Sequence, residues 1–219
     1  MMEIRAVLFD FIGTTVIEQV PNTISRCFEI AFAMNGIIVT EGFIEANRGK
    51  NKREAMELAI EKFNCHAPAD RVLRDFESAL KDNLHNFTAE PNAQILFHQL
   101  KAKRIKIGLG TGLTRDSFNL ILNHLGWNSI GFDYTATSEE IGKGRPHPDM
   151  IFDMMKKLNI TNPKHILKIG DTISDIEEGK NAGVWTAALL SGTQPKEKIL
   201  AGSPDFVLEQ LDLVGKIIS

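Results

Sequence analysis

The sequence predicts an α/β fold: a Rossmann-like, doubly wound parallel sheet with an all-helical segment inserted after its first strand. Four short apolar runs, over residues 4–9, 105–109, 165–169 and 184–190, alternate with stretches of helical pattern. Such runs are typical of parallel strands that are buried on both faces. Between residues 15 and 88, by contrast, apolar residues recur at helical spacing and no strand-like run interrupts them.

The first strand reads IRAVLF and stops at Asp10, after which Gly13 allows the chain to turn sharply. The inserted helices follow, and their apolar positions form three groups: Ile24, Cys27, Phe28, Ala31 and Phe32, then Met56, Ala59, Ile60 and Phe63, then Val72, Leu73, Phe76, Leu80 and Leu84. We therefore expect a helical domain of residues 16–87, inserted into an α/β core domain of residues 1–15 and 88–219.

The rest of the core alternates strands with helices, as a doubly wound sheet requires. The strand at 105–109 stops at Gly110-Thr111-Gly112, and Thr114 opens a helix for which Gly126 is the predicted stop. The strand at 165–169 stops at Gly170-Asp171-Thr172, and a helix begins at Ser174 or Asp175. That helix ends near Asn181, ahead of the last predicted strand.

Composition limits the class of protein. The chain has 219 residues, 43% hydrophobic and 24% charged, which is typical of a globular protein with a large core. A formal net charge of −3 leaves no basic footprint for nucleic acid. The N-terminus has no signal-peptide pattern, and no window approaches the roughly 18 apolar residues of a membrane span. We expect a cytoplasmic monomer or homodimer whose partner is a small molecule, with Cys27 and Cys65 as free thiols.

Three predicted strands end in residues suited to chemistry, and ligands of such sheets bind where strand ends converge. Asp10 follows the first strand, where it could be a nucleophile, a metal ligand or only a turn residue. Asp171 and Asp175 could share a hard cation such as Mg²⁺, or one of them could cap the following helix. These carboxylates are candidate ligands and reacting groups of one site.

Two further segments could bind an anion. Gly110-Thr111-Gly112 offers a hydroxyl and backbone N–H groups just before a helix, although an ordinary turn would have the same sequence. Lys143 and Arg145 lie in a loop stiffened by prolines, where they would be either a fixed positive charge or a solvated basic turn.

Together, the segments LFDFIGTT, GLGTG, GRPHPD and KIGDTISDIEEGKNAG resemble, in order and spacing, the haloacid dehalogenase superfamily. The resemblance covers essentially the whole chain. It is strongest to the phosphonatase-like branch, since DFIGTT resembles D-x-A-G-T-T and the arginine of GRPHPD matches that branch. The segment Gly49-Lys50-Asn51-Lys52 resembles its G-x-x-K motif, and the inserted helices resemble the family's cap domain.

The resemblance implies that Asp10 attacks phosphorus and forms an aspartyl-phosphate, which water then hydrolyses. It implies that Asp10, the backbone carbonyl of Ile12, Asp171 and Asp175 hold Mg²⁺.

It also implies that Thr111, the Gly112 N–H and Arg145 bind the phosphoryl oxygens. Lys52 matches the lysine that forms a Schiff base with an aldehyde substrate in phosphonatases; alternatively, Lys52 only contacts substrate or solvent.

Three positions depart from the resemblance. Ile12 stands where phosphatases of the superfamily carry a general acid/base Asp, whose absence typically costs about 10²–10⁴ in rate. Phosphonatases also lack that Asp, but Arg48 stands where they have Met, and Ala55 where they have an acid–base His.

We therefore predict a metal-dependent, phosphonatase-like hydrolase of a small phosphonate or phosphate. The alternatives are an ordinary phosphatase of activated phosphate esters, or a catalytically weak regulatory protein that binds phosphate and metal. A dehalogenase is disfavoured, since those relatives work without metal and this chain keeps Asp171 and Asp175.

Overall fold

The computed structural model describes residues 3–47 and 50–218. Within that part of the chain, six strands form one parallel sheet in the order β5-β4-β1-β6-β7-β8. Their bounds are β1 Ala6–Asp10, β4 Lys106–Thr111, β5 Tyr134–Thr137, β6 Ile166–Gly170, β7 Trp185–Leu189 and β8 Phe206–Leu208. The predicted doubly wound parallel sheet is confirmed.

Two strands of this sheet, β5 and β8, are not predicted by the sequence analysis. Both lie at the edges of the sheet and are short, four and three residues long. Edge strands this short lack the long apolar runs of the central strands, so their sequences, YTAT and FVL, carry little periodic signal.

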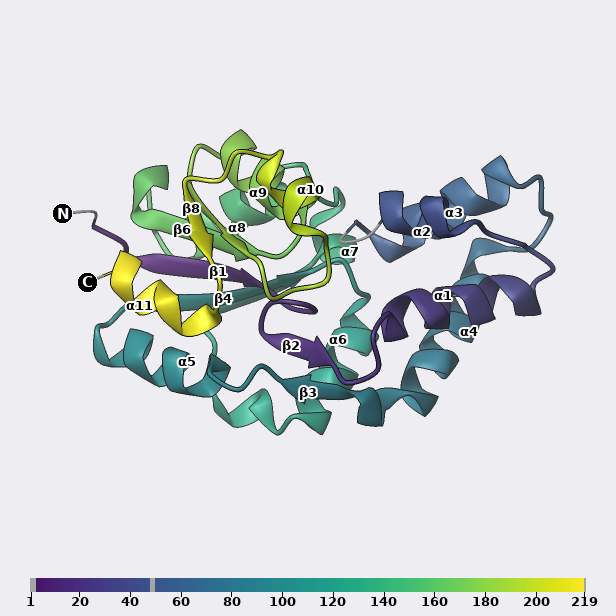
Figure 1. Ribbon diagram of the computed structural model, residues 1–219, viewed down its shortest axis with the longest axis horizontal. Coiled ribbons are helices and arrows are strands. Elements are labelled where there is room, and N and C mark those ends of the chain that lie inside the picture. The colour runs from purple at the N-terminus through teal and green to yellow at the C-terminus, as the bar shows by residue number, and fades with distance from the viewer. Residues whose placement is uncertain (1–2, 48–49, 219) are drawn as a thin grey trace.

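Helices cover both faces of the sheet (Figure 1). They are α5 Ala93–Ala102, α6 Arg115–His124, α7 Ser138–Ile141, α8 Asp149–Lys157, α9 Ile173–Asn181, α10 Lys196–Leu200 and α11 Val214–Ile217. Single 3-10 turns lie at Leu84–Asn86, Trp127–Ser129, Pro163–His165 and Leu211–Leu213. Alternate side chains of β1 point to opposite faces of the sheet. Val7 and Phe9 pack in one apolar cluster, whereas Ala6 and Leu8 pack in another with α8.

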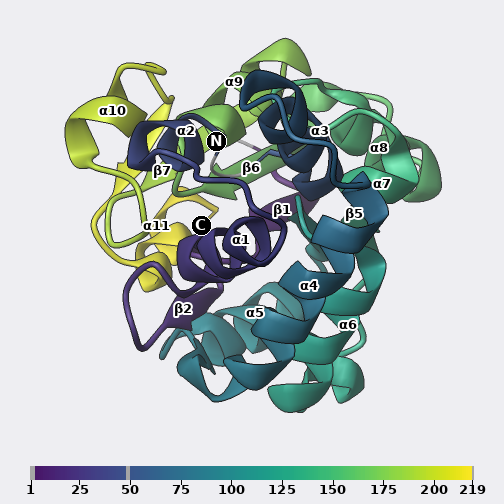
Figure 2. The same cartoon turned by 90° about the vertical axis from the view of Figure 1, so that its right-hand side faces the viewer.

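The four remaining helices lie together beyond one end of the sheet, and they face the viewer in Figure 2. They are α1 Thr23–Met34, α2 Glu41–Ala46, α3 Lys52–Lys62 and α4 Ala69–Asp82. Both α1 and α3 pack against α4. The rings of Phe28 and Phe76, one from α1 and one from α4, have centroids 4.7 Å apart. Apolar residues at helical spacing thus form the core of this helical group, as the pattern predicts.

The segment 16–87 is not wholly helical, however. Val16–Glu18 forms strand β2, which pairs antiparallel with β3, Phe87–Ala89. The expectation of an uninterrupted helical insertion is wrong at these residues, because a three-residue strand is too short for its alternation to be recognised. The division into a core domain and a helical domain stays a prediction, with this two-stranded ribbon at its boundary.

The register of the sheet positions the candidate residues. Asp10 lies opposite Gly110 on β4, and Phe9 lies opposite Ile169 on β6. The carboxyl ends of three neighbouring parallel strands therefore bring Asp10, Thr111 and Asp171 to one edge of the sheet. This edge is also where the strand order reverses on either side of β1, the usual position of a ligand site in such sheets.

Candidate active site

Three buried carboxylates gather at this edge of the sheet. Asp10 ends β1, Asp171 follows β6, and Asp175 lies in the first turn of α9. One carboxylate oxygen from each lies within 4.8 Å of the other two. Asp10 is 5% exposed and the other two are fully buried. The predicted convergence of these residues is confirmed.

Arg145 lies between two of the carboxylates. Its Nη1 donates to Asp10 Oδ1 at 2.6 Å and also to Asp175 Oδ1. Burial opposes the charge on Arg145, but the charges of Asp175 and Asp10 outweigh that effect and raise its pKa well above the usual value. Lys143, the other cation of the predicted basic loop, is exposed to solvent. The guanidinium of Arg145 is therefore the positive charge that this loop brings to the site.

A buried ion pair that the sequence analysis does not identify lies behind Asp175. Lys168, on β6, places Nζ 2.9 Å from Asp175 Oδ1 and 3.1 Å from Glu178 Oε2. Both Lys168 and Glu178 are essentially unexposed. The sequence does contain one indication of this ion pair, which is Lys168 itself. A single charged residue inside the apolar strand ILKIG needs a buried partner of opposite charge.

The charge balance of this network fits a divalent metal ion. Among the described residues it contains four carboxylates, those of Asp10, Asp171, Asp175 and Glu178, and two cations, Arg145 and Lys168. With every carboxylate ionised, its formal charge is −2. Uncompensated buried charge is costly. Carboxylate oxygens are the ligands that Mg²⁺ and Ca²⁺ prefer. An ion of charge +2 among the three aspartates would neutralise the site.

The pKa values of the aspartates separate under these charges. Burial, together with the charges of Asp10 and Asp175, raises the pKa of Asp171 to about 7. Burial would also raise the pKa of Asp175, but Arg145 and Lys168 outweigh it and hold that pKa at about 2. Burial raises the pKa of Asp10 despite its contact with Arg145. In the metal-free protein, Asp171 therefore carries a proton over a wider pH range than Asp175.

Two threonines hold the Asp171 carboxylate in place. Thr14 donates its hydroxyl at 3.2 Å, and the Thr193 backbone N–H and hydroxyl both donate, the N–H at 2.7 Å. Gly13 has φ of +92°, and a Cβ at that position would lie 2.2 Å from Asp171 Oδ2. The loop after β1 can approach Asp171 this closely only with glycine at residue 13. Gly13 is predicted from the sequence as a turn residue. Neither threonine is predicted as a site residue, and the partner of Thr14, Asp171, is distant in sequence.

An open cavity lies in front of these carboxylates, between the sheet edge and helices α1 to α3. The predicted residues that line it are Asp10, Ile12, Lys52, Thr111, Gly112 and Arg145. Ile12 is half-buried beside the predicted nucleophile. The cavity thus brings the candidate phosphoryl-binding residues, the candidate nucleophile and the helical lysine to one space, with Asp171 and Asp175 behind Asp10.

Lys52 is the first residue of α3 and is buried against the core. Its backbone N–H donates to the Gly112 carbonyl at 3.1 Å, and its Nζ lies 5.4 Å from the centroid of the Phe28 ring. A Cβ at Gly144 would lie 2.9 Å from the Cβ of Asn51, the residue that caps α3. The start of α3 therefore contacts two core loops directly.

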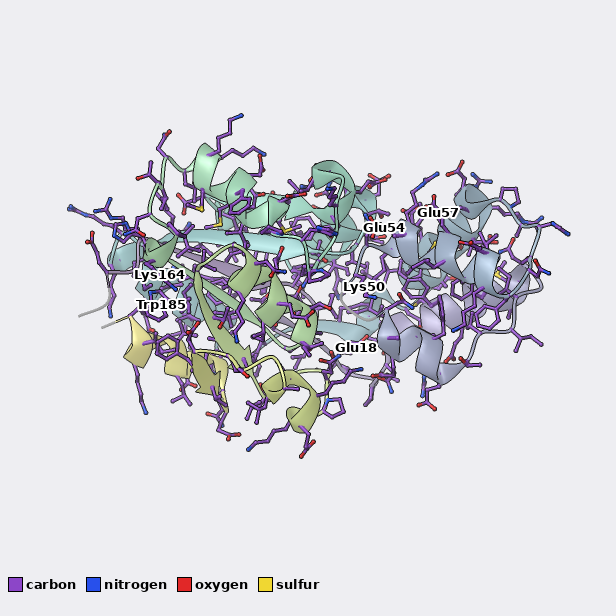
Figure 3. All side chains as sticks on the ribbon, turned by 90° about the horizontal axis from the view of Figure 1, so that it is seen from above. Glu18, Lys50, Glu54, Glu57, Lys164 and Trp185 are labelled. Atoms are coloured by element: carbon purple, nitrogen blue, oxygen red, sulfur yellow. The ribbon has the colours of Figure 1, made fainter. Side chains whose placement is uncertain are left out.

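Figure 3 shows Lys50 and Glu18 at the junction of the sheet and the inserted helices, with Glu54 and Glu57 farther along α3. Lys164 and Trp185 mark the opposite end of the molecule in the same view. Arg48 and Gly49, which the sequence analysis singles out, lie outside the described residues. Among the described residues of the predicted G-x-x-K segment, Lys52 lines the cavity.

Comparison with known proteins agrees with this geometry. The family model described as haloacid dehalogenase-like hydrolase matches residues 7–189. The chain belongs to this family. The predicted membership of the haloacid dehalogenase superfamily is confirmed, and with it the prediction of a hydrolase.

Individual relatives and solved structures are similar to this chain over nearly its whole length. A protein of Bacillus cytotoxicus named phosphonoacetaldehyde hydrolase is 29% identical over 98% of this chain and 84% of its own length. A crystal structure of a phosphonoacetaldehyde hydrolase-like protein from Oleispira antarctica superimposes with a TM-score of 0.84 at 19% identity, over 99% of this chain and 91% of the other. A hydrolase from Pseudomonas syringae gives a TM-score of 0.84 at 20% identity, over 97% of each chain. The Bacillus relative agrees with the predicted phosphonatase-like branch, and the two structures confirm the fold.

Within residues 3–47 and 50–218, no helix combines the length and apolar character that crossing a bilayer would need.

Proposed function

We propose that this protein is a metal-dependent hydrolase that cleaves a small-molecule phosphonate or phosphate through an aspartyl-phosphate on Asp10. The observation that supports it most is the position of the Asp10 carboxylate, at the wall of a cavity, in contact with Arg145 and within 4.8 Å of Asp171 and Asp175. The relative named phosphonoacetaldehyde hydrolase supports a phosphonate as one substrate class.

The three aspartates would hold Mg²⁺, together with the backbone carbonyl of Ile12. When bound, this ion supplies positive charge that offsets the repulsion between Asp10 and an anionic phosphoryl group. Thr14 and Thr193 keep Asp171 oriented, and Lys168 keeps Asp175 ionised. These partners prepare the ligand set before any metal ion arrives.

The phosphoryl group would bind at the end of β4. The Thr111 oxygen accepts a hydrogen bond from the Leu113 N–H at 3.2 Å, which leaves its own proton for a phosphoryl oxygen. The Gly112 N–H and the Arg145 guanidinium would bind the other oxygens. An Asp10 oxygen then attacks phosphorus, the bond from phosphorus to the leaving atom breaks, and water later hydrolyses the aspartyl-phosphate.

Ile12 restricts which bond can break. An isoleucine cannot protonate a leaving alkoxide, so the leaving group must depart without that proton. Lys52 offers one route. Its Nζ would condense with a substrate aldehyde, with loss of water, to a protonated imine, which accepts the electron pair of the breaking C–P bond and becomes a neutral enamine. Protonation of the enamine carbon and hydrolysis would then release the dephosphorylated aldehyde and restore the lysine. Its position in the wall of the same cavity as Asp10 supports this role.

A second candidate is an ordinary phosphatase of activated esters such as acyl phosphates, whose leaving groups need no proton. The observation that favours it is Ala55, which lines the cavity where phosphonatases carry an acid–base histidine. A phosphate- and metal-binding regulatory protein is the third possibility and becomes the preferred one if no turnover occurs.

Phosphate release from phosphonoacetaldehyde, acetyl phosphate and sugar phosphates, with and without Mg²⁺, tests these candidates. We expect release to require Mg²⁺ and to vanish in Asp10→Asn. Loss of phosphonoacetaldehyde cleavage in Lys52→Ala but not in the matched Lys50→Ala would identify the imine route. Release from acetyl phosphate alone would identify the second candidate. Saturable thermal stabilisation by phosphate plus Mg²⁺ without turnover would overturn the enzymatic proposal.

A further inference from the structure

The cavity next to Asp10 has two chemically different walls. The wall at the sheet edge carries the groups that suit a phosphoryl anion. The wall formed by the inserted helices is largely apolar: Ile24, Phe28 and Phe32 come from α1, Phe43 and Ile44 from α2, and Ala55 from α3. Ile12 continues the apolar surface up to the nucleophile.

We infer that the organic group of the substrate is apolar, an alkyl or aryl group, and that it binds against this helical wall. The inference deepens the proposed function and rests on it. Its basis is continuity: the same cavity contains the phosphoryl-binding residues Thr111 and Arg145 and the rings of Phe28 and Phe43. A substrate whose phosphorus lies at Asp10 must extend its organic group toward those rings.

Residue 55 helps to set the space that is open to the organic group. Ala55 contributes to that space, because its side chain is a single methyl group where α3 meets the cavity. A larger residue at position 55 would occupy part of the same volume.

The charged residues of the helical wall are engaged with the protein itself. Glu18 accepts a hydrogen bond from the Ile24 N–H at 2.7 Å and so anchors the start of α1. The Lys52 ammonium lies over the Phe28 ring and donates to the Lys50 carbonyl at 3.4 Å. These contacts hold the starts of α1 and α3 in place beside the apolar rings, and Lys52 lines the same cavity as Asp10.

Alkyl- and arylphosphonates with unactivated C–P bonds test the inference by binding alone. We would titrate methylphosphonate, butylphosphonate and phenylphosphonate into the Mg²⁺-loaded protein by calorimetry. Each methylene that is buried tightens binding roughly three- to fourfold, so butyl- and phenylphosphonate should bind about tenfold or more tightly than methylphosphonate. Equal affinities, or weaker binding of the two larger phosphonates, would overturn the inference.

A substitution that fills part of the cavity tests where the organic group binds. Ala55→Leu should reduce the affinity gain of butylphosphonate over methylphosphonate, whereas Leu58→Phe, on the exposed side of the same helix, should preserve it. A full gain retained in a folded Ala55→Leu would overturn the placement of the organic group. Should Ala55→Leu not fold, Ile44→Ala, at a half-buried position of the wall, should lower the gain instead.

Turnover separates this inference from the proposed function. Benzoyl phosphate and acetyl phosphate both have leaving groups that need no proton, and we expect kcat/KM to be about tenfold or more higher for benzoyl phosphate. Equal kcat/KM values, with release still dependent on Mg²⁺ and Asp10, would overturn the apolar specificity and leave the proposed function standing. Tighter binding of phenylphosphonate with no phosphate release from either acyl phosphate would overturn the proposed hydrolase function and support the apolar binding site.

Discussion

One guanidinium nitrogen of Arg145 lies 2.6 Å from an oxygen of Asp10, and the same nitrogen also contacts Asp175. The proposed nucleophile and a proposed metal ligand are therefore joined by a single buried cation. This arrangement keeps two like charges together in the protein interior, and it makes the charge of the site depend on a loop far from either carboxylate in sequence.

Replacing Arg145 should damage both stability and activity. Arg145→Ala leaves Asp10 and Asp175 without their shared cation, which should cost about 3–5 kcal/mol of unfolding free energy in the metal-free protein. Arg145→Lys keeps the charge but loses the planar donor geometry, so it should fold and lower kcat by roughly 10²–10³. Urea unfolding and phosphate release measure the two effects. An Arg145→Lys variant with full activity would contradict the role of the guanidinium.

The stability of the metal-free protein should fall as pH rises from about 4 to about 7. The pKa of Asp171 is about 7 in the folded protein against an ordinary value of 3.8, so in this window the unfolded chain is ionised while the folded protein keeps the proton. Unfolding then releases a proton, and the contribution lost by pH 8 is on the order of 4 kcal/mol.

Asp171→Asn should remove that decline, so in EDTA at pH 8 the variant should be more stable than the wild type. Adding Mg²⁺ should stabilise the wild type and not the variant. Urea unfolding across pH 4 to 8 checks both statements. A wild-type stability that increases over this range, with Asp171→Asn less stable at pH 8, would show that the Asp171 carboxylate is not held protonated.

The buried pair of Lys168 and Glu178 should be coupled. Lys168→Met leaves Glu178 and Asp175 without that cation and should cost about 3–5 kcal/mol, as expected for a broken buried pair. Adding Glu178→Gln to Lys168→Met should recover part of this loss. A double-mutant cycle by urea unfolding measures the coupling, and additive losses would show that the two residues act independently.

A carboxylate at residue 12 should extend the range of leaving groups. Ile12 lines the cavity beside Asp10, so Ile12→Asp would place an acid where the leaving group departs. We expect turnover of sugar phosphates to rise by about 10²–10⁴, with little change for acetyl phosphate, whose leaving group needs no proton. Ile12→Asn is the matched control, because it is polar but cannot supply a proton. An equal gain in both variants would refute the explanation.

The sequence predicts the parts of the site that follow buried strands. The apolar runs that end at Asp10, Gly110 and Gly170 are central strands, and parallel pairing brings their ends together without further information. Thr114 caps α6 as predicted, since its side chain accepts from the Ser117 N–H. These features depend on local pattern and on the general geometry of parallel sheets.

Other features depend on packing between distant segments and could not be predicted in this way. The helical spacing predicts that Phe28 and Phe32 are buried. It does not predict that they line a cavity together with Asp10. Lys168 and Glu178 are ten residues apart and become partners only when α9 packs on β6. The ribbon of β2 and β3 joins residues about seventy positions apart, so neither three-residue strand is recognisable alone.

The central claim is that Asp10 receives the phosphoryl group, and acid quenching during turnover tests it most directly. The protein would be mixed with acetyl phosphate and Mg²⁺, quenched within the first turnovers, digested and analysed by mass spectrometry. We predict one phosphoryl group on the peptide that contains Asp10, absent without Mg²⁺ and absent in Asp10→Asn. Phosphate release that continues in Asp10→Asn, with no phosphoryl group on that peptide in the wild type, would contradict the claim.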